Sequence, residues 1–461
     1  MLPLVPRPVV VVSNRGPLSF ERGENDQLTS KRGAGGLVGA LGPAVASIGA
    51  TWIAAATSED DRLAASRGLT ETDGYHLRLL TIDDRAWRAY YDTISNSTLW
   101  YLYHGLFDAV RRPLFDRHWR AAWDRYREVN EQFARAVVET APKDSFVLVH
   151  DYHLSLVGAI VAKERPDVRT VHFHHTPFAR PDELRMLPDD VSQELLTGLT
   201  AFGSCGFHTK RWAGAFTASC ETVLGSVPST FVSPAAANLD EVREVSASAD
   251  AARASDSLHG LVGDRRLIVR NDRMELSKNI LRGFLAFDEL LATRPEWRGK
   301  VVFAAYVYPS RQTLADYLGY RAEVESLVER LNARWSTGDG WTPIVLSTED
   351  DFPGAMAALR AADVLLVNPV RDGLNLVAKE GVSINERDAV LVLSRESGVW
   401  DELGEWSLGV NPFDVGGTAD ALHRALSMDA DDRSSRAAAL RAAASARTPH
   451  DWYRDQLDAA T

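Results

Sequence analysis

Short runs of apolar residues recur along the chain, and longer segments that mix apolar and charged residues separate them. In the first half, the clearest runs are Val9–Val12, Ser145–Val149 and Thr170–Phe173. A strand that is covered on both faces is apolar at consecutive positions, so these runs predict strands of a parallel sheet. Apolar and charged residues interleave over Ala121–Val138, as they do in an amphipathic helix. Strands that alternate with helices are typical of an α/β fold.

A second series of apolar runs follows after residue 266. Its members are Leu267–Arg270, Val301–Ala305, Pro343–Leu346, Val364–Val367 and Val390–Leu393. Between the two series, residues 240–256 are rich in Ala, Ser and Asp and weakly hydrophobic, which indicates a connector or an exposed helix. We therefore predict two doubly wound domains, residues 1–250 and 251–447, with a ligand-binding cleft between them.

Composition narrows the class of protein. A chain of 461 residues is too long to fold around one ordinary hydrophobic core. The net charge of −12 argues against a nucleic-acid partner, because such binding needs a basic face. No apolar run approaches the ~18 residues of a membrane span, and Cys205 and Cys220 are too few for a disulfide framework. We expect a cytoplasmic protein without a membrane partner. The sequence contains no pattern that predicts its oligomeric state, although cytoplasmic enzymes often form symmetric homo-oligomers.

Polar residues follow the predicted strand Val364–Val367 in the segment Asn368–Glu380. In a parallel sheet, ligands bind beyond the carboxyl ends of the strands, where a helix start offers free N–H groups to an anion. Asp372 is placed to meet a neutral polar ligand such as a sugar. Glu380, two turns further on, is placed to bind a pair of hydroxyl groups. The segment therefore has the pattern of a sugar-nucleotide site.

Cations follow two other predicted strands. Arg273 and Lys278 lie five residues apart at a strand–helix junction, where they would neutralise a diphosphate leaving group as a glycosidic bond breaks. Arg15 follows Val9–Val12, and its guanidinium suits a phosphate. The alternative interpretation is a surface salt bridge for Arg15 and a solvated charged turn for Arg273 and Lys278.

Two further segments have the composition of ligand-binding loops. Lys31–Gly39 is rich in glycine, and small residues let a diphosphate approach the backbone. Val38 stands where a dinucleotide fingerprint requires glycine, so a nicotinamide site is not favoured over a flexible loop. The aromatic stretch around Tyr91 and Trp100 offers rings for a sugar and an O–H and an N–H for a phosphate, or else ordinary core packing.

Histidines cluster at two predicted strand ends, in the segments 150–153 and 172–175. His172 and His174 would share one face of a strand and so suit a metal, but a third ligand would have to come from elsewhere. We therefore predict that Asp151 and His175 bind ligand hydroxyl groups and that the other histidines pack in the core.

Taken together, these segments resemble the trehalose-6-phosphate synthase family of retaining glycosyltransferases over nearly the whole chain. The resemblance implies a GT-B fold, in which two Rossmann-like domains face each other across a cleft and a C-terminal helix, residues 448–461, crosses back to the first domain. It implies transfer of glucose from UDP- or GDP-glucose to glucose 6-phosphate, giving α,α-trehalose 6-phosphate, without a metal or other cofactor. It also implies a front-face route, in which the departing phosphate takes the proton of the acceptor hydroxyl.

The same resemblance assigns roles by position. The glucose 6-phosphate site would comprise Arg15, Tyr91, Trp100, Asp151 and Arg311. The donor site would comprise Gly36, His175, Arg273, Lys278, Asp372, Gly373, Asn375, Leu376, Val377 and Glu380. Within these sets, the catalytic residues would be Asp151, His175, Arg273, Lys278 and Asp372.

One position departs from the family pattern. Ala55 stands three residues after Trp52, where the family typically has a second tryptophan near the acceptor, and the Glu59–Asp61 segment that follows resembles actinobacterial members. The alternatives are therefore an enzyme with another acceptor, such as a glucosylglycerol-phosphate synthase or an aminocyclitol pseudo-glycosyltransferase, and a non-catalytic sugar-phosphate sensor. The base of the donor is not readable from the sequence.

Overall fold

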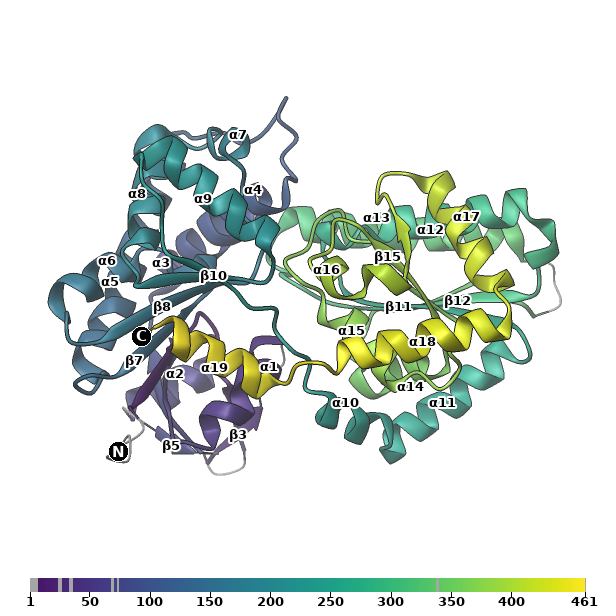
Figure 1. Ribbon diagram of the computed structural model, residues 1–461, viewed down its shortest axis with the longest axis horizontal. Helices are drawn as coiled ribbons and strands as arrows, with labels where there is room; N and C mark the ends of the chain where they lie inside the picture. Colours follow the sequence, from purple (N-terminus) through teal and green to yellow (C-terminus); the bar gives the residue numbers. More distant parts are fainter. Residues whose placement is uncertain are drawn as a thin grey trace. The chain divides into compact units, whose positions relative to one another are not determined.

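The computed structural model describes residues 7–23, 27–32, 36–67, 70–72, 74–336 and 340–460. The chain divides into two units (Figure 1). Unit 1 comprises Met1–Ala235 and Pro449–Thr461, and unit 2 comprises Ala236–Thr448. The central glycines of the predicted phosphate loop, residues 33–35, lie outside the described residues.

Unit 1 is built on an eight-stranded sheet with the order β10-β9-β8-β7-β1-β4-β6-β5. Its neighbouring strands pair in parallel, except β5 and β6, which are antiparallel. The strands are β1 (Val9–Val12), β4 (Thr51–Ala55), β5 (Thr70–Thr72), β6 (Tyr75–Leu80), β7 (Phe146–His150), β8 (Arg169–His174), β9 (Ser204–Phe207) and β10 (Thr230–Val232). A separate antiparallel hairpin consists of β2 (Leu18–Arg22) and β3 (Leu28–Arg32).

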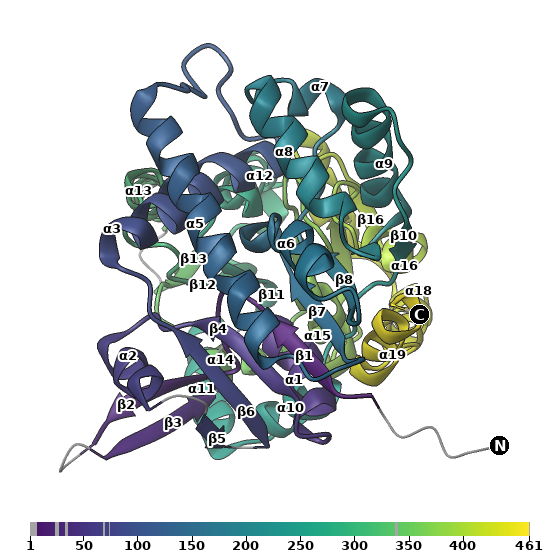
Figure 2. The ribbon, with the colours of Figure 1, turned by 90° about the vertical axis from the view of Figure 1, so that its left-hand side faces the viewer.

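Helices connect the strands of unit 1. They are α1 (Gly36–Ala46), α2 (Glu59–Ser66), α3 (Asp84–Trp87), the π-helix η2 (Arg88–Leu99), α4 (Trp100–His104), α5 (Arg117–Thr140), the 3₁₀ turn η3 (Tyr152–Leu154), α6 (Val157–Glu164), α7 (Pro181–Leu184), α8 (Asp189–Thr200), α9 (Lys210–Leu224) and α19 (Pro449–Ala459). Figure 2 shows α5 and α6 side by side, and the two helices pack against each other. Asp116 caps α5 by accepting hydrogen bonds from the first helical N–H groups, which fixes where this helix begins.

Unit 2 contains a six-stranded sheet in which neighbouring strands are parallel, with the order β13-β12-β11-β14-β15-β16. The strands are β11 (Arg266–Arg273), β12 (Val301–Tyr308), β13 (Ile344–Ser347), β14 (Val364–Val367), β15 (Val390–Ser394) and β16 (Leu408–Val410). The order reverses direction between β11 and β14, so the carboxyl ends of these two strands are neighbours at the point where doubly wound sheets bind ligands.

Helices cover both faces of this sheet. They are α10 (Leu239–Ser246), α11 (Ala249–Val262), η4 (Leu276–Lys278), α12 (Ile280–Thr293), η5 (Pro295–Trp297), α13 (Ala315–Trp335), α14 (Phe352–Ala361), α15 (Leu376–Ile384), α16 (Trp400–Leu403), η6 (Gly404–Trp406), α17 (Val415–Ser427) and α18 (Ala430–Ala444). In Figure 1, α12, α13 and α17 lie above the strands of unit 2, and α11, α14 and α18 lie below them. This double cover is why β14 is apolar and buried at every position.

The predicted boundary between residues 250 and 251 is displaced from the division in the structure, which falls between Ala235 and Ala236. Of the two predicted alternatives, a connector or an exposed helix, residues 240–256 follow the second, because they form most of α10 and the first part of α11, and these helices pack on α14. The segment is weakly hydrophobic because each helix buries only a narrow stripe, which includes Val242 and Ala251.

The last helix of the chain, α19, belongs to unit 1 and packs on α1. It buries Trp452 and Tyr453, and Asp455 accepts a hydrogen bond from Ser233 Oγ at 2.8 Å, next to the end of β10. The end of the sequence thus contributes to the core of the unit in which the chain begins.

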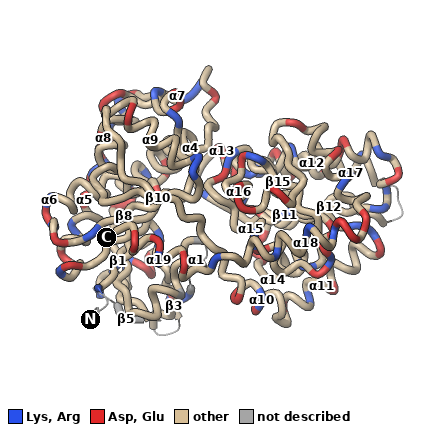
Figure 3. Tube along the Cα trace, in the orientation of Figure 1, with Lys and Arg blue, Asp and Glu red and all other residues tan. Residues whose placement is uncertain are grey.

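Charged residues of both signs are interleaved along the helices of both units (Figure 3). None of the helices in the described residues combines the length and apolarity that a membrane crossing requires.

Candidate functional site

Asp151 lies at the carboxyl end of β7 in a backbone conformation that L-residues rarely adopt, with φ 72° and ψ 166°. Its N–H donates to the Phe173 carbonyl (2.8 Å), and its own carbonyl accepts from His172 Nε2 (3.1 Å). Its Oδ1 accepts from the backbone N–H of His175 at 3.3 Å. The ends of β7 and β8 therefore hold this carboxylate in place, and such enforced strain is typical of functional sites.

His175 lies beside Asp151 and is half-buried. Its Nε2 is 3.1 Å from Nδ1 of His150, and the ring of His208 lies 5.4 Å from its own ring centre. Burial, followed by the charges that His208 and other nearby histidines would carry, holds the pKa of His175 well below its usual range. The imidazole is therefore neutral, and it can exchange hydrogen bonds with a sugar hydroxyl without adding charge.

The neighbouring histidines are core residues. His150 and His172 are fully buried and His174 is 1% exposed. His174 packs edge-on against Tyr103 with ring centres 4.6 Å apart. This burial agrees with the prediction that the histidines other than His175 pack. Among the described residues, no group of three or more His, Cys, Asp and Glu side chains has the arrangement of a metal site.

We expect the free energy of unfolding to fall as the pH drops below about 6.5. Burial lowers the pKa of His150, His172, His174 and His175 in the folded state, that of His172 to about 4. The unfolded chain then binds protons that the folded chain does not. The stability that these histidines provide is fully present above pH 6.5 and is lost as the pH falls toward 4. Thermal unfolding between pH 8 and pH 4 measures the effect.

The variant His174→Phe should flatten this pH dependence, because a phenyl ring fits among the surrounding aromatic rings and takes up no proton. His259→Gln is the matched control, since that histidine is exposed on α11. Equal pH dependence in wild type and His174→Phe would contradict the prediction.

Arg15 and Tyr91, two residues predicted to hold an acceptor phosphate, meet in unit 1. Arg15 Nη2 donates to the Tyr91 hydroxyl at 3.2 Å, and its guanidinium lies 5.9 Å from the centre of the ring. Tyr91 is stacked on Trp87 with ring centres 4.9 Å apart. Trp100 differs, since it is only 2% exposed and its ring packs on His104 at 4.4 Å. The exposed arginine is therefore the better-placed phosphate ligand of the three.

Lys278 and Asp372 come together at the neighbouring ends of β11 and β14. Lys278 Nζ lies 2.6 Å from Asp372 Oδ2, and the two side chains are 11% and 15% exposed. Asn375 Nδ2 donates to the same oxygen at 3.1 Å. Burial alone would lower the pKa of Lys278, but the carboxylates of Asp372 and Asp272 outweigh it and raise this pKa, so the side chain is an ammonium.

Arg273 and Arg311 share one carboxylate that sequence reasoning missed. Glu275 Oε1 lies 3.0 Å from Arg273 Nη1 and 3.3 Å from Arg311 Nη1. The Glu275 side chain is 1% exposed, whereas that of Arg273 is 47% exposed. A lone acidic residue between two cations at a strand end is the sequence signal that points to it, because clustered cations need a compensating charge.

The start of α15 presents backbone donors next to Asp372. Asn375 precedes the helix with φ 89°, and its side chain accepts from the Ala378 N–H at 3.1 Å. Leu376 and Val377 are the first two helical residues, and the N–H groups of such residues have no partner within a helix. These groups can hold an anion.

Gly398 supports this loop from behind. Its N–H donates to the Asp372 carbonyl at 3.1 Å, and a Cβ at this position would lie 2.0 Å from the Gly373 carbonyl oxygen. We expect Gly398→Ala to displace the loop, to lower the free energy of unfolding by about 1–3 kcal/mol and to raise the KM for a donor. Gly214→Ala is the control, because a Cβ there meets nothing within 4 Å. Calorimetry and donor titration measure both effects, and an unchanged KM would contradict the prediction.

Glu380 lies one turn into α15 and is half-buried. Burial, with a smaller effect from the carboxylate of Glu241, raises the pKa of Glu380 to about 7. The side chain therefore changes charge near neutral pH and can both donate to and accept from a pair of hydroxyl groups. Gly36, the remaining residue of the predicted donor site, opens α1 in unit 1.

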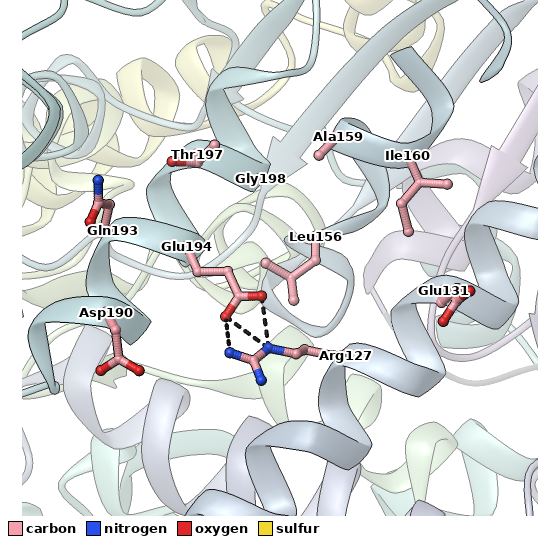
Figure 4. A pocket seen from close by; sticks show the side chains of 10 residues that line it. All are labelled: Arg127, Glu131, Leu156, Ala159, Ile160, Asp190, Gln193, Glu194, Thr197 and Gly198. Carbon is pink, nitrogen blue, oxygen red and sulfur yellow. Dashed lines mark hydrogen bonds and ion pairs between the residues drawn. The ribbon is translucent and has the colours of Figure 1, made fainter. Parts of the chain in front are cut away.

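A pocket of about 490 Å³ lies between α5, α6 and α8, away from these residues (Figure 4). Figure 4 shows the Arg127 guanidinium facing Glu194, and their shortest N–O distance is 2.8 Å. Asp190 is likewise paired with Arg120, at 2.6 Å. None of the predicted site residues lines this pocket. We assign it no part in the chemistry.

Comparison with known proteins gives a family match over almost the entire chain. Residues 7–461 match the family model of glycosyltransferase family 20. The chain is 35% identical to the bifunctional trehalose-6-phosphate synthase/phosphatase of Thermoproteus tenax, over 80% of this chain and 51% of that protein. It is 34% identical to the trehalose-6-phosphate synthase of Mycobacterium sp. (strain JLS), over 98% of this chain and 95% of that protein. The chain thus spans about half the length of the longer, bifunctional relative.

Solved structures agree with this match. An E. coli protein bound with UDP-2-fluoro glucose is 27% identical, with a TM-score of 0.85 over 98% of this chain and 99% of that one. A UDP-forming α,α-trehalose-phosphate synthase of Burkholderia xenovorans, in complex with glucose-6-phosphate, has the same identity, TM-score and coverage. These similarities confirm the predicted fold class, an α/β protein of the GT-B type with two Rossmann-like domains.

Proposed function

The chain belongs to glycosyltransferase family 20, and from this premise we propose that it moves glucose from a nucleoside diphosphate glucose to glucose 6-phosphate with retention of configuration. The product would be α,α-trehalose 6-phosphate. Relatives that cover nearly the same length are named trehalose-6-phosphate synthases, and similar structures hold a UDP-glucose analogue or glucose-6-phosphate. These names and ligands support the proposal.

The observation that carries the donor half is the cluster at the ends of β11 and β14. Arg273, Lys278 and the N–H groups of Leu376 and Val377 form a cationic and hydrogen-bonding surface that suits a diphosphate. Asp372 already accepts from two donors on one oxygen. A donor sugar bound here would either replace Asp372 as the partner of Lys278 and Asn375 or share these two donors with it.

The remaining roles follow residue by residue. His175 and Asp372 would hold the donor glucose, Gly373 and Asn375 would belong to the same donor site, Glu380 would bind the ribose, and Gly36 would lie against the diphosphate. Arg15, Tyr91, Trp100 and Arg311 would hold the acceptor phosphate, and Asp151 would accept a hydrogen bond from an acceptor hydroxyl.

The chemistry asks the protein mainly for position and positive charge. The bond from the anomeric carbon to the diphosphate oxygen breaks, and a bond to the acceptor oxygen forms on the same face. The acceptor proton passes to the departing phosphate. Negative charge therefore grows on the leaving group in the transition state, where Arg273 and Lys278 would stabilise it. Alignment of the acceptor hydroxyl would supply the rest of the acceleration.

A related enzyme with another acceptor is the second candidate, because Ala55 replaces a bulky residue of the family pattern. Ala55 ends β4 and is 3% exposed, and its N–H donates to the Asn14 carbonyl at 3.2 Å, next to Arg15. A small side chain at this point, in place of an indole, would give the acceptor site a different shape.

A panel of donors and acceptors tests the proposal. UDP-, GDP- and ADP-glucose would each be combined with glucose 6-phosphate, glycerol 3-phosphate and an aminocyclitol phosphate. We expect nucleoside diphosphate release and an α,α-linked product with glucose 6-phosphate, detected by NMR. Turnover with another acceptor only would favour the second candidate. Thermal protection by the ligands without any turnover would favour a sensor.

We also propose that the protein works in the cytoplasm. Cys205 and Cys220 are buried free thiols, as is usual in a reducing compartment. Cell fractionation tests the compartment, and light scattering of the pure protein tests whether it forms a homo-oligomer.

A further inference from the structure

Glu275 is a buried carboxylate that contacts residues from two separate strand ends. It lies two residues after the end of β11, between Arg273 and Lys278 in the sequence. Besides the two arginines, it accepts a hydrogen bond from Ser310 Oγ at 3.0 Å. Ser310 and Arg311 come from the loop after β12. One side chain therefore ties the cation at the end of β11 to the cation in the neighbouring loop.

Hydrogen bonds of the main chain fix the backbone of Glu275. Glu275 N–H donates to the Arg273 carbonyl at 2.7 Å, and its own carbonyl accepts from the Lys278 N–H at 3.0 Å. Met274 N–H donates to the Tyr308 carbonyl at 2.8 Å, which joins the turn to β12. These bonds hold the Glu275 backbone in place, and burial together with the Ser310 hydroxyl then restrains its carboxylate.

Arg311 depends on this anchor. Its φ of 43° is unusual for a residue with a side chain, its side chain is 9% exposed, and its guanidinium also hydrogen-bonds to Tyr317. A strained residue persists where its surroundings hold it. The ion pair with Glu275 and the bond to Tyr317 are two such restraints.

The charges around Glu275 also indicate that its carboxylate holds both arginines. Burial raises the pKa of Glu275, but the charges of Arg273, Arg311 and Lys278 outweigh burial and lower this pKa to about 2. The group is therefore an anion at any working pH. Without it, the two guanidinium groups would repel each other, and each would move to find another partner.

We propose that Glu275 is a positioning residue that couples the two substrate sites, because it holds the donor-phosphate cation Arg273 and the acceptor-phosphate cation Arg311 on one oxygen. This inference rests on the proposed function for the roles of the two arginines. When one phosphate draws its arginine into place, the shared carboxylate fixes the other arginine as well. Binding of either ligand then favours binding of the other, and this coupling is reciprocal.

Calorimetry on the full chain tests the coupling. The dissociation constants of UDP and glucose 6-phosphate would be measured for each ligand alone and with the other ligand saturating. In wild type, we expect each ligand to tighten the other by about fivefold or more. In Glu275→Gln, we expect both dissociation constants to rise by about tenfold and the coupling to vanish. Glu275→Asp, which keeps the charge, should recover part of the wild-type affinity and part of the coupling.

Two controls separate coupling from a loss of folding. Ser310→Ala removes one hydrogen bond and keeps both ion pairs, so it should retain the coupling. Asp288→Asn disturbs a structural carboxylate of unit 2, which is 18% exposed and paired with Arg334, and should change stability without affecting either ligand. Thermal unfolding of each variant shows whether it is folded.

The inference is overturned if Glu275→Gln keeps the wild-type coupling, or if it weakens only one of the two ligands. Inorganic diphosphate is a probe that does not depend on the identity of the sugars. If wild type binds diphosphate but neither UDP nor glucose 6-phosphate, the proposed function fails. In that case the positioning role of Glu275 is tested by diphosphate alone. Weaker binding of diphosphate to Glu275→Gln than to wild type supports the role, and equal binding overturns it.

Discussion

Replacement of Lys278 by alanine is expected to lower kcat by about 100- to 1000-fold, with a much smaller change in the KM for glucose 6-phosphate. The Lys278 side chain is 11% exposed and its ammonium lies 2.6 Å from Asp372, where water cannot easily substitute for it. Its charge matters most when the diphosphate departs, because negative charge then increases. An interaction that strengthens only in the transition state raises kcat rather than lowering KM.

The loss of Lys278 also removes the ion pair with Asp372 and a positive charge near Asp272, which stays paired with Arg270. A fall in stability must therefore be separated from a fall in rate. Lys278→Met keeps the length of the side chain, and the pair Lys278→Met with Asp372→Asn removes both charges. Lys300→Ala, at an exposed position of the same unit, is the matched control. Single-turnover kinetics on folded variants measures the chemical step, and a kcat within threefold of wild type in Lys278→Met would rule out the role.

The strands that the sequence predicts best are those covered by helices on both faces. Val9–Val12 and Val364–Val367 are apolar throughout because no position of either strand faces water. β9 escaped prediction because its first three residues, Ser204 to Gly206, are small. A Cβ at Gly206 would lie 2.4 Å from the Phe231 ring and 2.5 Å from the Phe173 ring, so the neighbouring side chains select glycine there. Tertiary packing, rather than strand propensity, determines such positions.

Part of the candidate site could be predicted, because several of its residues follow strands that the sequence predicts well. Arg273, Lys278 and Asp372 follow apolar strands, and a parallel sheet brings such strand ends to one edge. That Lys278 and Asp372 touch depends on β11 and β14 being neighbours, which no local pattern specifies. The contact between Glu275 and Arg311 depends on the path of the loop after β12, which sequence patterns do not describe. The chemical class of ligand that each side chain suits followed from its residue type at a strand end, whereas the assignment of Arg15, Tyr91 and Arg311 to one particular substrate came only from the family resemblance.

Removal of the Trp452 side chain is expected to lower the free energy of unfolding by about 3–5 kcal/mol, the range for a buried aromatic residue cut to alanine. Trp452 is fully buried in α19, and its ring lies 5.0 Å from that of Phe173, 5.7 Å from that of His175 and 6.0 Å from that of His150. The indole therefore fills the space behind the strand ends that carry Asp151 and His175.

The cavity left by Trp452→Ala would free His175 to turn away from Asp151, so we expect the kcat/KM for a donor to fall as well. Trp452→Phe is the matched control, because it keeps a ring in contact with Phe173 and removes an indole N–H that has no hydrogen-bond partner among the described residues. That variant should lose little stability. Denaturant titration and histidine NMR measure the two effects, since solvent reaching the His175 imidazole should raise its pKa toward the ordinary value. A stable Trp452→Ala protein with an unchanged His175 signal would show that α19 supports neither the core nor the site.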